Sequence, residues 1–214
     1  GWSSPVIADG RLWVTTSVED SEGSSLRILA YDTETGDQLT NSEVFRVEDS
    51  DSPNPKNSLA SPTAVIDPNN ERVYVHFGAY GTAAVSLDGE ILWATQFPYI
   101  SQHGNGGSPL IYDDLLILSI DGYDTAYVVA LNSETGDEQW RTTRAEPVSQ
   151  AYSTPLLINT GSTEQLISVA AFRTTAHNPL TGAELWSVGY RNGFSNVPRP
   201  VFGHGMVYLS TGFQ

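Results

Sequence analysis

Short apolar runs separated by turn residues recur along the whole chain. In one stretch the runs are residues 109–112, 115–120, 126–131 and 138–142, and clusters of Asp, Ser and Gly lie between them. Runs this short, rich in Val, Ile, Leu, Tyr and Trp, predict β-strands, and no segment holds a helical period of useful length. The pattern therefore predicts an all-β chain built from groups of four consecutive strands.

This four-strand group repeats about every 46 residues. A Ser-Pro or Thr-Pro pair opens it at Pro5, Pro62, Pro109 and Pro155, and an Arg-Pro variant stands at Pro200. Four strands in a repeat of this length match one blade of a β-propeller. We therefore predict one propeller region over residues 1–214, with repeats at 1–60, 61–107, 108–153 and 154–198 and a partial repeat at 199–214.

A glycine turn and a tryptophan mark the second half of each repeat. The turn glycines are Gly36, Gly89, Gly136 and Gly182. Four residues after the last three glycines stand Trp93, Trp140 and Trp186, whereas the first repeat has Thr40 there. An alanine precedes the glycine by six residues at Ala30, Ala130 and Ala176. We interpret all of these residues as structural, because glycine supplies a positive φ between the third and fourth strands and tryptophan can pack between neighbouring blades.

The segment Ala130-Leu-Asn-Ser-Glu-Thr-Gly-Asp-Glu-Gln-Trp140 resembles the tryptophan-docking motif of PQQ-type, quinoprotein alcohol dehydrogenase-like β-propeller repeats, and residues 176–186 match it as well. Residues 103–109 and 197–205 are also similar to the uncharacterised bacterial proteins with PQQ-binding-like repeats. The resemblance covers the whole chain and is weakest in the first repeat. It implies four-stranded antiparallel blades, about four and a half of them, forming an arc of a ring of about 7–8 blades.

The resembling family contains both PQQ-dependent dehydrogenases and non-enzymatic propellers. We expect a non-enzymatic binding or scaffold module that is periplasmic or secreted. The alternatives are a fragment of a PQQ-dependent oxidoreductase and the sensor region of a larger signalling protein. The resemblance to the dehydrogenases implies PQQ beside a calcium ion and a vicinal disulfide, but this chain has no cysteine and shows no recognisable Glu–Asn–Asp set. We therefore predict no cofactor, no metal and no catalytic residue, and assign PQQ and calcium to the dehydrogenase alternative.

Charge and composition narrow the range of partners. The formal net charge of −15 disfavours nucleic acid and anionic membrane surfaces. No apolar run is long enough to span a membrane. We expect a protein partner or a small polar ligand. We also expect bare sheet edges beside Tyr208 and on the first blade, which the same polypeptide or self-association would cover.

The propeller fold sorts loops into two faces. Connections from a fourth strand to the next blade, and turns between second and third strands, lie on the face around the axis, which we name the axial face. The Thr-Gly turns lie on the opposite face. We expect any ligand at the axial face, through loops 46–60, 96–107, 143–153 and 189–199.

Polar side chains of these loops are the candidate ligand-binding residues, since Arg, Tyr and Asn suit a carboxylate or a sugar. They are His103, Asn105, Arg144, Tyr152, Tyr190, Arg191, Asn196 and Arg199. For His103 the alternative is a solvated histidine in a glycine-rich turn. We interpret His76, His177 and His204 as structural. We interpret Asp121 and Asp124 as an exposed turn rather than a calcium loop.

Overall fold

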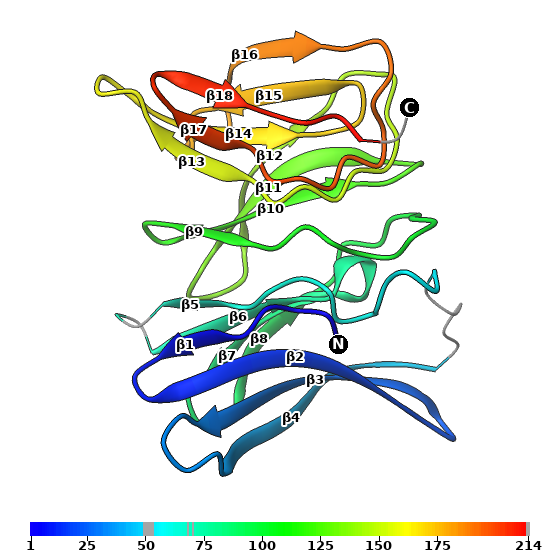
Figure 1. The fold of residues 1–214 in the computed structure, drawn as a ribbon, viewed down its shortest axis with the longest axis vertical. Helices are drawn as coiled ribbons and strands as arrows, with labels where there is room; N and C mark the ends of the chain where they lie inside the picture. The colour runs from blue at the N-terminus through cyan, green and yellow to red at the C-terminus, as the bar shows by residue number, and fades with distance from the viewer. Residues whose placement is uncertain (49–53, 68, 70, 213–214) are drawn as a thin grey trace. The chain divides into compact units, whose positions relative to one another are not determined.

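The structure is a computed structural model, and it describes residues 1–48, 54–67, 69 and 71–212 (Figure 1). The chain divides into two compact units. The first comprises Gly1–Pro98, Gln102–Asn105 and Glu134–Gly136, and the second comprises Tyr99–Ser101, Gly106–Ser133 and Asp137–Gln214. Apart from one 3-10 turn, η1 (Gly78–Tyr80), the regular elements of the described residues are β-strands. The prediction of an all-β chain is confirmed.

Two four-stranded antiparallel sheets form most of the first unit, each with its strands in chain order. The first sheet contains β1 (Val6–Ala8), β2 (Arg11–Asp20), β3 (Gly23–Asp32) and β4 (Gln38–Val47). The second contains β5 (Val65–Asp67), β6 (Arg72–His76), β7 (Thr82–Ser86) and β8 (Ile91–Thr95). Both sheets are blades of the predicted kind.

The second unit repeats this arrangement and adds a hairpin. Its first sheet contains β9 (Leu110–Tyr112), β10 (Leu115–Asp121), β11 (Ala126–Asn132) and β12 (Glu138–Thr143). Its second contains β13 (Leu156–Asn159), β14 (Glu164–Val169), β15 (Arg173–His177) and β16 (Glu184–Gly189). The hairpin pairs β17 (Val201–Gly203) with β18 (Met206–Tyr208).

In three blades and in the β17–β18 hairpin, the turn between the first and second strands holds a non-glycine residue with a positive φ, whereas the β13–β14 turn has Gly161. These residues are Asp9, Glu71, Asp113 and His204, with φ between 49° and 52°. Short polar side chains tolerate this left-handed conformation better than branched ones do. His204 therefore occupies the turn position of Asp9.

Alanine and tryptophan lie directly opposite each other on the third and fourth strands. Ala84 pairs with Trp93, Ala130 with Trp140, and Ala176 with Trp186, and a register shift follows each alanine. These three alanines are completely buried, whereas the three tryptophans are half-buried. A small cross-strand neighbour leaves room for the indole ring to lie over the sheet.

Trp93 and Trp140 each pack on the turn glycine of the next repeat, and not on the turn glycine of their own repeat. A Cβ added to Gly136 would lie 2.7 Å from Cε3 of Trp93, and one added to Gly182 would collide with the Trp140 ring. The Trp140 indole N–H also donates to the backbone oxygen of Pro179, at 3.1 Å. In the first repeat the Thr40 methyl group lies against Gly89 instead.

Apolar cores lie between consecutive sheets within each unit. In the first unit, Trp13, Ile28 and Leu26 of one sheet pack with Val73 and Val85 of the next. In the second unit, Ile167 and Ala176 pack with side chains of the β17–β18 hairpin. Blades that bury one another in this way hold their connecting loops in fixed positions.

His76 is a buried histidine at the end of β6. Only 3% of its surface is exposed, and its Nδ1 lies 2.8 Å from Oγ1 of Thr82. This is the structural role that the sequence suggested. Burial lowers the pKa of His76 to about 4, so the folded protein holds this imidazole neutral in mildly acidic solution.

We expect the free energy of unfolding to fall as the pH drops from about 6.5 to about 4. An unfolded histidine takes up a proton near pH 6.5, whereas folded His76 does so only near pH 4, so proton uptake favours the unfolded state. The loss attributable to His76 is about 3 kcal/mol at the acidic end. Urea unfolding of the wild type and of His76→Gln at several pH values measures it. Identical pH dependence in both proteins would contradict the assignment.

Candidate binding site

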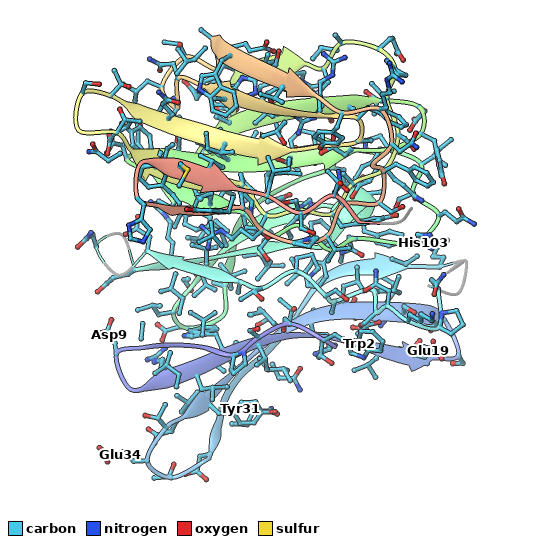
Figure 2. The ribbon with its side chains drawn as sticks, turned by 45° about the horizontal axis from the view of Figure 1, so that its top comes forward. Trp2, Asp9, Glu19, Tyr31, Glu34 and His103 are labelled. Atoms are coloured by element: carbon cyan, nitrogen blue, oxygen red, sulfur yellow. The ribbon has the colours of Figure 1, made fainter. Side chains whose placement is uncertain are left out.

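The two kinds of connection lie at opposite ends of the first sheet. Figure 2 shows Asp9 and Glu34, from the β1–β2 and β3–β4 turns, at one end of the first unit, and Glu19 and His103 at the other end. The end with Glu19 carries the β2–β3 turn, and it is therefore the axial end of this sheet. Residues 49–53 of the loop predicted at this end lie outside the described residues.

His103 and Asn105 are the candidates in the first unit, and the loop that precedes β5 holds both. Asn57 Nδ2 donates to the backbone oxygens of His103, at 2.5 Å, and Asn105, at 2.9 Å. His103 Nδ1 accepts from Asn54 Nδ2 at 2.9 Å, because an amide nitrogen can only donate. Asn105 is buried and its Nδ2 donates to the backbone oxygen of Leu59, at 3.2 Å. These contacts fasten the glycine-rich segment to the loop.

Arg144, in the second unit, forms a buried ion pair with Asp121. Its Nε donates to Oδ1 of Asp121 at 2.6 Å and its Nη2 to Oδ2 at 3.1 Å. The same guanidinium donates to the hydroxyl groups of Ser168, at 2.7 Å, and Thr175, at 3.1 Å. This geometry ties the end of β10 to the following sheet. These contacts use the Arg144 N–H groups that a ligand would otherwise bind.

The expectation that Asp121 belongs to an exposed turn is wrong. Its surface is only 3% exposed, whereas Asp124 of the same turn is exposed. Burial raises the pKa of the Asp121 carboxyl group, and the Arg144 guanidinium opposes that effect. The two hydrogen bonds from Arg144 compensate for the hydration that the buried Asp121 carboxylate loses.

His177 extends the same buried network. Its Nδ1 lies 3.0 Å from the backbone oxygen of Gly182 and therefore carries the proton, because a carbonyl oxygen can only accept. Its Nε2 then accepts from Oγ1 of Thr175 at 2.8 Å. Burial lowers the pKa of His177, which agrees with a neutral ring. The structural interpretation of His177 matches these contacts.

Three further candidates of the second unit also hydrogen-bond within the fold. The Tyr190 hydroxyl group donates to the backbone oxygen of Ala170, and Asn196 Nδ2 donates to the same oxygen, at 2.8 Å. Asn196 Oδ1 accepts from the backbone N–H of Gly212 at 2.9 Å. The Tyr152 hydroxyl group donates to Oε1 of Gln150 at 2.5 Å. These side chains position the backbone of the axial loops.

The eight candidates do not form one cluster within either unit. Four of the six in the second unit are engaged in the fold as described, and the remaining two, Arg191 and Arg199, are exposed. Arg199 Nε donates to the backbone oxygen of Pro155 at 3.2 Å. The sequence pattern therefore could not tell residues with partners inside the fold from exposed ones.

A shallow surface depression lies at the axial end of the second unit, and it encloses essentially no space that a water molecule could fill. Segments from the β10–β11 turn, the loop after β12 and the β14–β15 turn form its walls. The lining residues are Asp121, Ala126, Arg144, Ala145, Pro147, Val148, Ser149, Ala170, Ala171 and Arg173. Sequence analysis missed Arg173, because no motif distinguishes it from other strand residues.

Two exposed residues, Ile100 and Tyr123, belong to segments that hydrogen-bond to each other in the second unit. Ile100 is 62% exposed and Tyr123 is 44% exposed. The Tyr123 backbone N–H donates to the backbone oxygen of Ile100 at 2.9 Å, and Asp124 Oδ1 accepts from the Ile100 N–H at 2.8 Å. Tyr123 is two residues from Asp121, which lines the depression. Ile100 and Tyr123 therefore present exposed apolar surface at the axial end, on segments that hydrogen bonds hold in place.

A calcium ion would need several oxygen ligands from the described residues to lie together. Within that part of the chain, no three His, Asp or Glu side chains come together as a metal site. Asp121, the buried carboxylate at the axial end of β10, is engaged by Arg144. Among the same residues there is no helix with the length and apolarity needed to cross a membrane.

Solved structures with the same fold include both enzymes and an assembly factor. Quinohemoprotein alcohol dehydrogenase from Comamonas testosteroni matches with a TM-score of 0.65 at 14% identity, over 97% of this chain and 38% of that one. BamB from Moraxella catarrhalis matches with a TM-score of 0.64 at 14% identity, over 98% and 54% of the two chains. A europium-containing methanol dehydrogenase gives 0.63 at 11% identity, over 88% and 41%. The chain therefore spans about half or less of these relatives.

Sequence comparison assigns the family more directly. A search of the curated proteins returned no significant match. The family model described as "Outer membrane protein assembly factor BamB" matches residues 86–214, which is more than half of the chain. Together with the four-stranded blades and the structural matches, this shows that the chain belongs to that family of PQQ-like β-propeller proteins.

Proposed function

We propose that the chain is a non-enzymatic binding or scaffold module, and that its axial end binds a protein partner. The observation that carries the proposal is the exposed pair of Ile100 and Tyr123 on a turn fixed by backbone hydrogen bonds. Exposed aromatic and aliphatic side chains on a rigid support are typical of the residues that dominate protein interfaces.

The surrounding polar groups support binding rather than covalent chemistry. Arg144, Tyr190 and Asn196 donate their hydrogen bonds to groups of the fold, and they therefore stiffen the axial loops. A surface that is already ordered loses little conformational entropy when a partner binds. The depression is also much smaller than the roughly 300–1,000 Å³ of a usual small-molecule site.

The family relationship supports the same role. One of the solved structures of this fold is BamB, and the matching family model describes an outer membrane protein assembly factor. We extend the proposal to an extracytoplasmic location and to a single propeller region made of the repeats set out above. The excess of acidic residues agrees with a protein partner rather than nucleic acid.

Site-specific photo-crosslinking tests the binding face. A photoreactive phenylalanine at Tyr123 is expected to crosslink one partner of defined mass, whereas the same probe at Leu180, which is 54% exposed in the turn between β15 and β16, is expected to give no adduct. With the purified partner, the double variant Ile100→Ser, Tyr123→Ser should weaken binding about tenfold or more. Adducts from Leu180 alone would refute the axial face as the binding surface.

A spectroscopic titration addresses the dehydrogenase alternative. We expect no saturable change in tryptophan fluorescence or visible absorbance when PQQ and calcium are added. Saturable binding at stoichiometric PQQ would favour the dehydrogenase alternative and contradict the proposal.

A further inference from the structure

The chain contains two Asn-Gly pairs, Asn105-Gly106 and Asn192-Gly193. An asparagine before a glycine can react with its own backbone, because the glycine nitrogen attacks the side-chain amide carbon where no Cβ hinders the approach. The reaction needs an asparagine side chain that is free to turn toward the following peptide group. The surroundings of the two asparagines differ, and only one of the pairs meets this requirement.

Asn105 is fixed inside the first unit. Only 3% of its surface is exposed, and its Nδ2 donates to the backbone oxygen of Leu59 at 3.2 Å. Its own backbone oxygen accepts from Asn57 Nδ2 at 2.9 Å. Turning the Asn105 side chain toward Gly106 would break a buried hydrogen bond and leave the Leu59 oxygen without that donor, which is costly. The fold therefore protects Asn105.

Asn192 lies in the loop that follows β16, and it is exposed. Among the described residues, neither its side-chain amide nor the N–H of Gly193 makes a hydrogen bond. The Asn192 side chain can therefore turn, and the Gly193 nitrogen can attack it, without breaking a hydrogen bond of either group. Gly193 itself is buried, but its reaction partner is the neighbouring side chain, so no ligand has to enter the fold.

We propose that Asn192 is a site of spontaneous covalent modification and that Asn105 is not. The Gly193 nitrogen attacks Cγ of Asn192 and forms a new C–N bond, and the side-chain nitrogen leaves as ammonia with the proton of the Gly193 N–H. The product is a succinimide ring whose carbonyl carbons both belong to exposed residue 192. Water adds to either carbon and breaks its bond to the Gly193 nitrogen, which regains a proton, and the product is aspartate or isoaspartate.

The isoaspartate product adds one atom to the backbone beside an anchored residue. Phe172 N–H donates to the backbone oxygen of Gly193 at 2.7 Å, and Asn196 Nδ2 donates to the same oxygen at 3.3 Å. Gly193 also packs closely on the Tyr190 ring, since an added Cβ would lie 2.9 Å from Cδ2. A longer backbone at residue 192 displaces the Gly193 oxygen from its donors. The modification therefore loosens this loop.

Ageing of the purified chain in mildly alkaline buffer, followed by peptide mapping with mass spectrometry, tests the site. We expect residue 192 to convert about tenfold faster than residue 105 or more, with both aspartate and isoaspartate among the products. Comparable conversion of the two residues in the folded protein would overturn the proposal, and so would an unmodified residue 192. Aspartate without isoaspartate would indicate direct hydrolysis of the amide and refute the cyclisation.

The same measurement in concentrated urea shows whether the fold causes the difference. Unfolding removes the hydrogen bond between Asn105 and Leu59, so we expect the two pairs to convert at rates within about twofold of each other. A difference of about tenfold that persisted in the unfolded chain would come from the local sequence and refute the structural argument.

Two variants separate the longer backbone from the added charge. Asn192→Gln has a side chain one carbon longer, for which ring closure is slower, and it should stay unmodified. Freshly prepared Asn192→Asp carries the new charge on an ordinary backbone. Hydrogen exchange of the Phe172 N–H should be about threefold faster or more in the isolated isoaspartate form and unchanged in Asn192→Asp. Equal exchange rates in the isoaspartate form and the wild type would refute the effect on the loop.

Discussion

Replacing Asp121 with alanine is expected to lower the free energy of unfolding by about 3–5 kcal/mol. The substitution leaves the Arg144 guanidinium buried without a negative partner. In the wild type, only 3% of the Arg144 side chain and 2% of the Asp121 side chain are exposed to solvent. A charge in that environment keeps the hydration cost and loses the attraction that offset it. Urea or thermal unfolding followed by circular dichroism measures the loss.

Two controls show whether burial is the cause. Glu138→Ala breaks the ion pair with Arg141, whose side chains are 41% and 38% exposed, and it should cost less than about 1 kcal/mol. The double variant Asp121→Leu, Arg144→Met removes both buried charges and should recover much of the loss, although Ser168 and Thr175 would each lose a donor. A cost for Asp121→Ala as small as that of Glu138→Ala would contradict the buried pair.

Strand positions were readable from the sequence because turn residues interrupt the apolar runs. In the third repeat the expected runs 115–120 and 138–142 correspond to β10 and β12, which each extend one residue further. The first repeat was harder, because β2, β3 and β4 are ten residues long and carry Ser, Thr, Arg and Glu among their apolar positions. Polar side chains on one face of a sheet break an apolar run without ending the strand.

The sequence predicted that the tryptophans pack between neighbouring blades, but it did not identify the residues they contact. Trp140 packs on Gly182 of the next repeat, a contact that the pattern within one repeat does not specify. The buried ion pair between Asp121 and Arg144 was missed for a related reason. Asp121 and Arg144 are 23 residues apart, and each looks like an exposed charged loop residue until both are placed together in the core. Arg173 differs from its neighbours through the burial of its Nε, which no sequence motif signals.

Replacing Gly136 with alanine is expected to lower the free energy of unfolding by about 2–5 kcal/mol, and replacing Gly36 by only about 1–2 kcal/mol. Both glycines have φ of +79°, so the added Cβ strains the two backbones equally. Only at Gly136 does that Cβ meet a neighbour, 2.7 Å from Cε3 and 2.8 Å from Cδ2 of Trp93, whereas nothing lies within 4 Å at Gly36. The difference between the two variants therefore measures how closely the tryptophan ring packs on the turn.

A double-mutant cycle tests the ring as the source of that difference. In a Trp93→Ala background, Gly136→Ala should cost no more than Gly36→Ala does in the wild type, because the space left by the ring accommodates the methyl group. Chemical denaturation of the four proteins gives the coupling free energy, which we expect to be about 1–3 kcal/mol. Equal costs for Gly36→Ala and Gly136→Ala in the wild type would show that the turn needs its glycine only for the backbone. The contact between Trp93 and Gly136 would then contribute nothing to stability, and the docking interpretation of the tryptophans would be wrong.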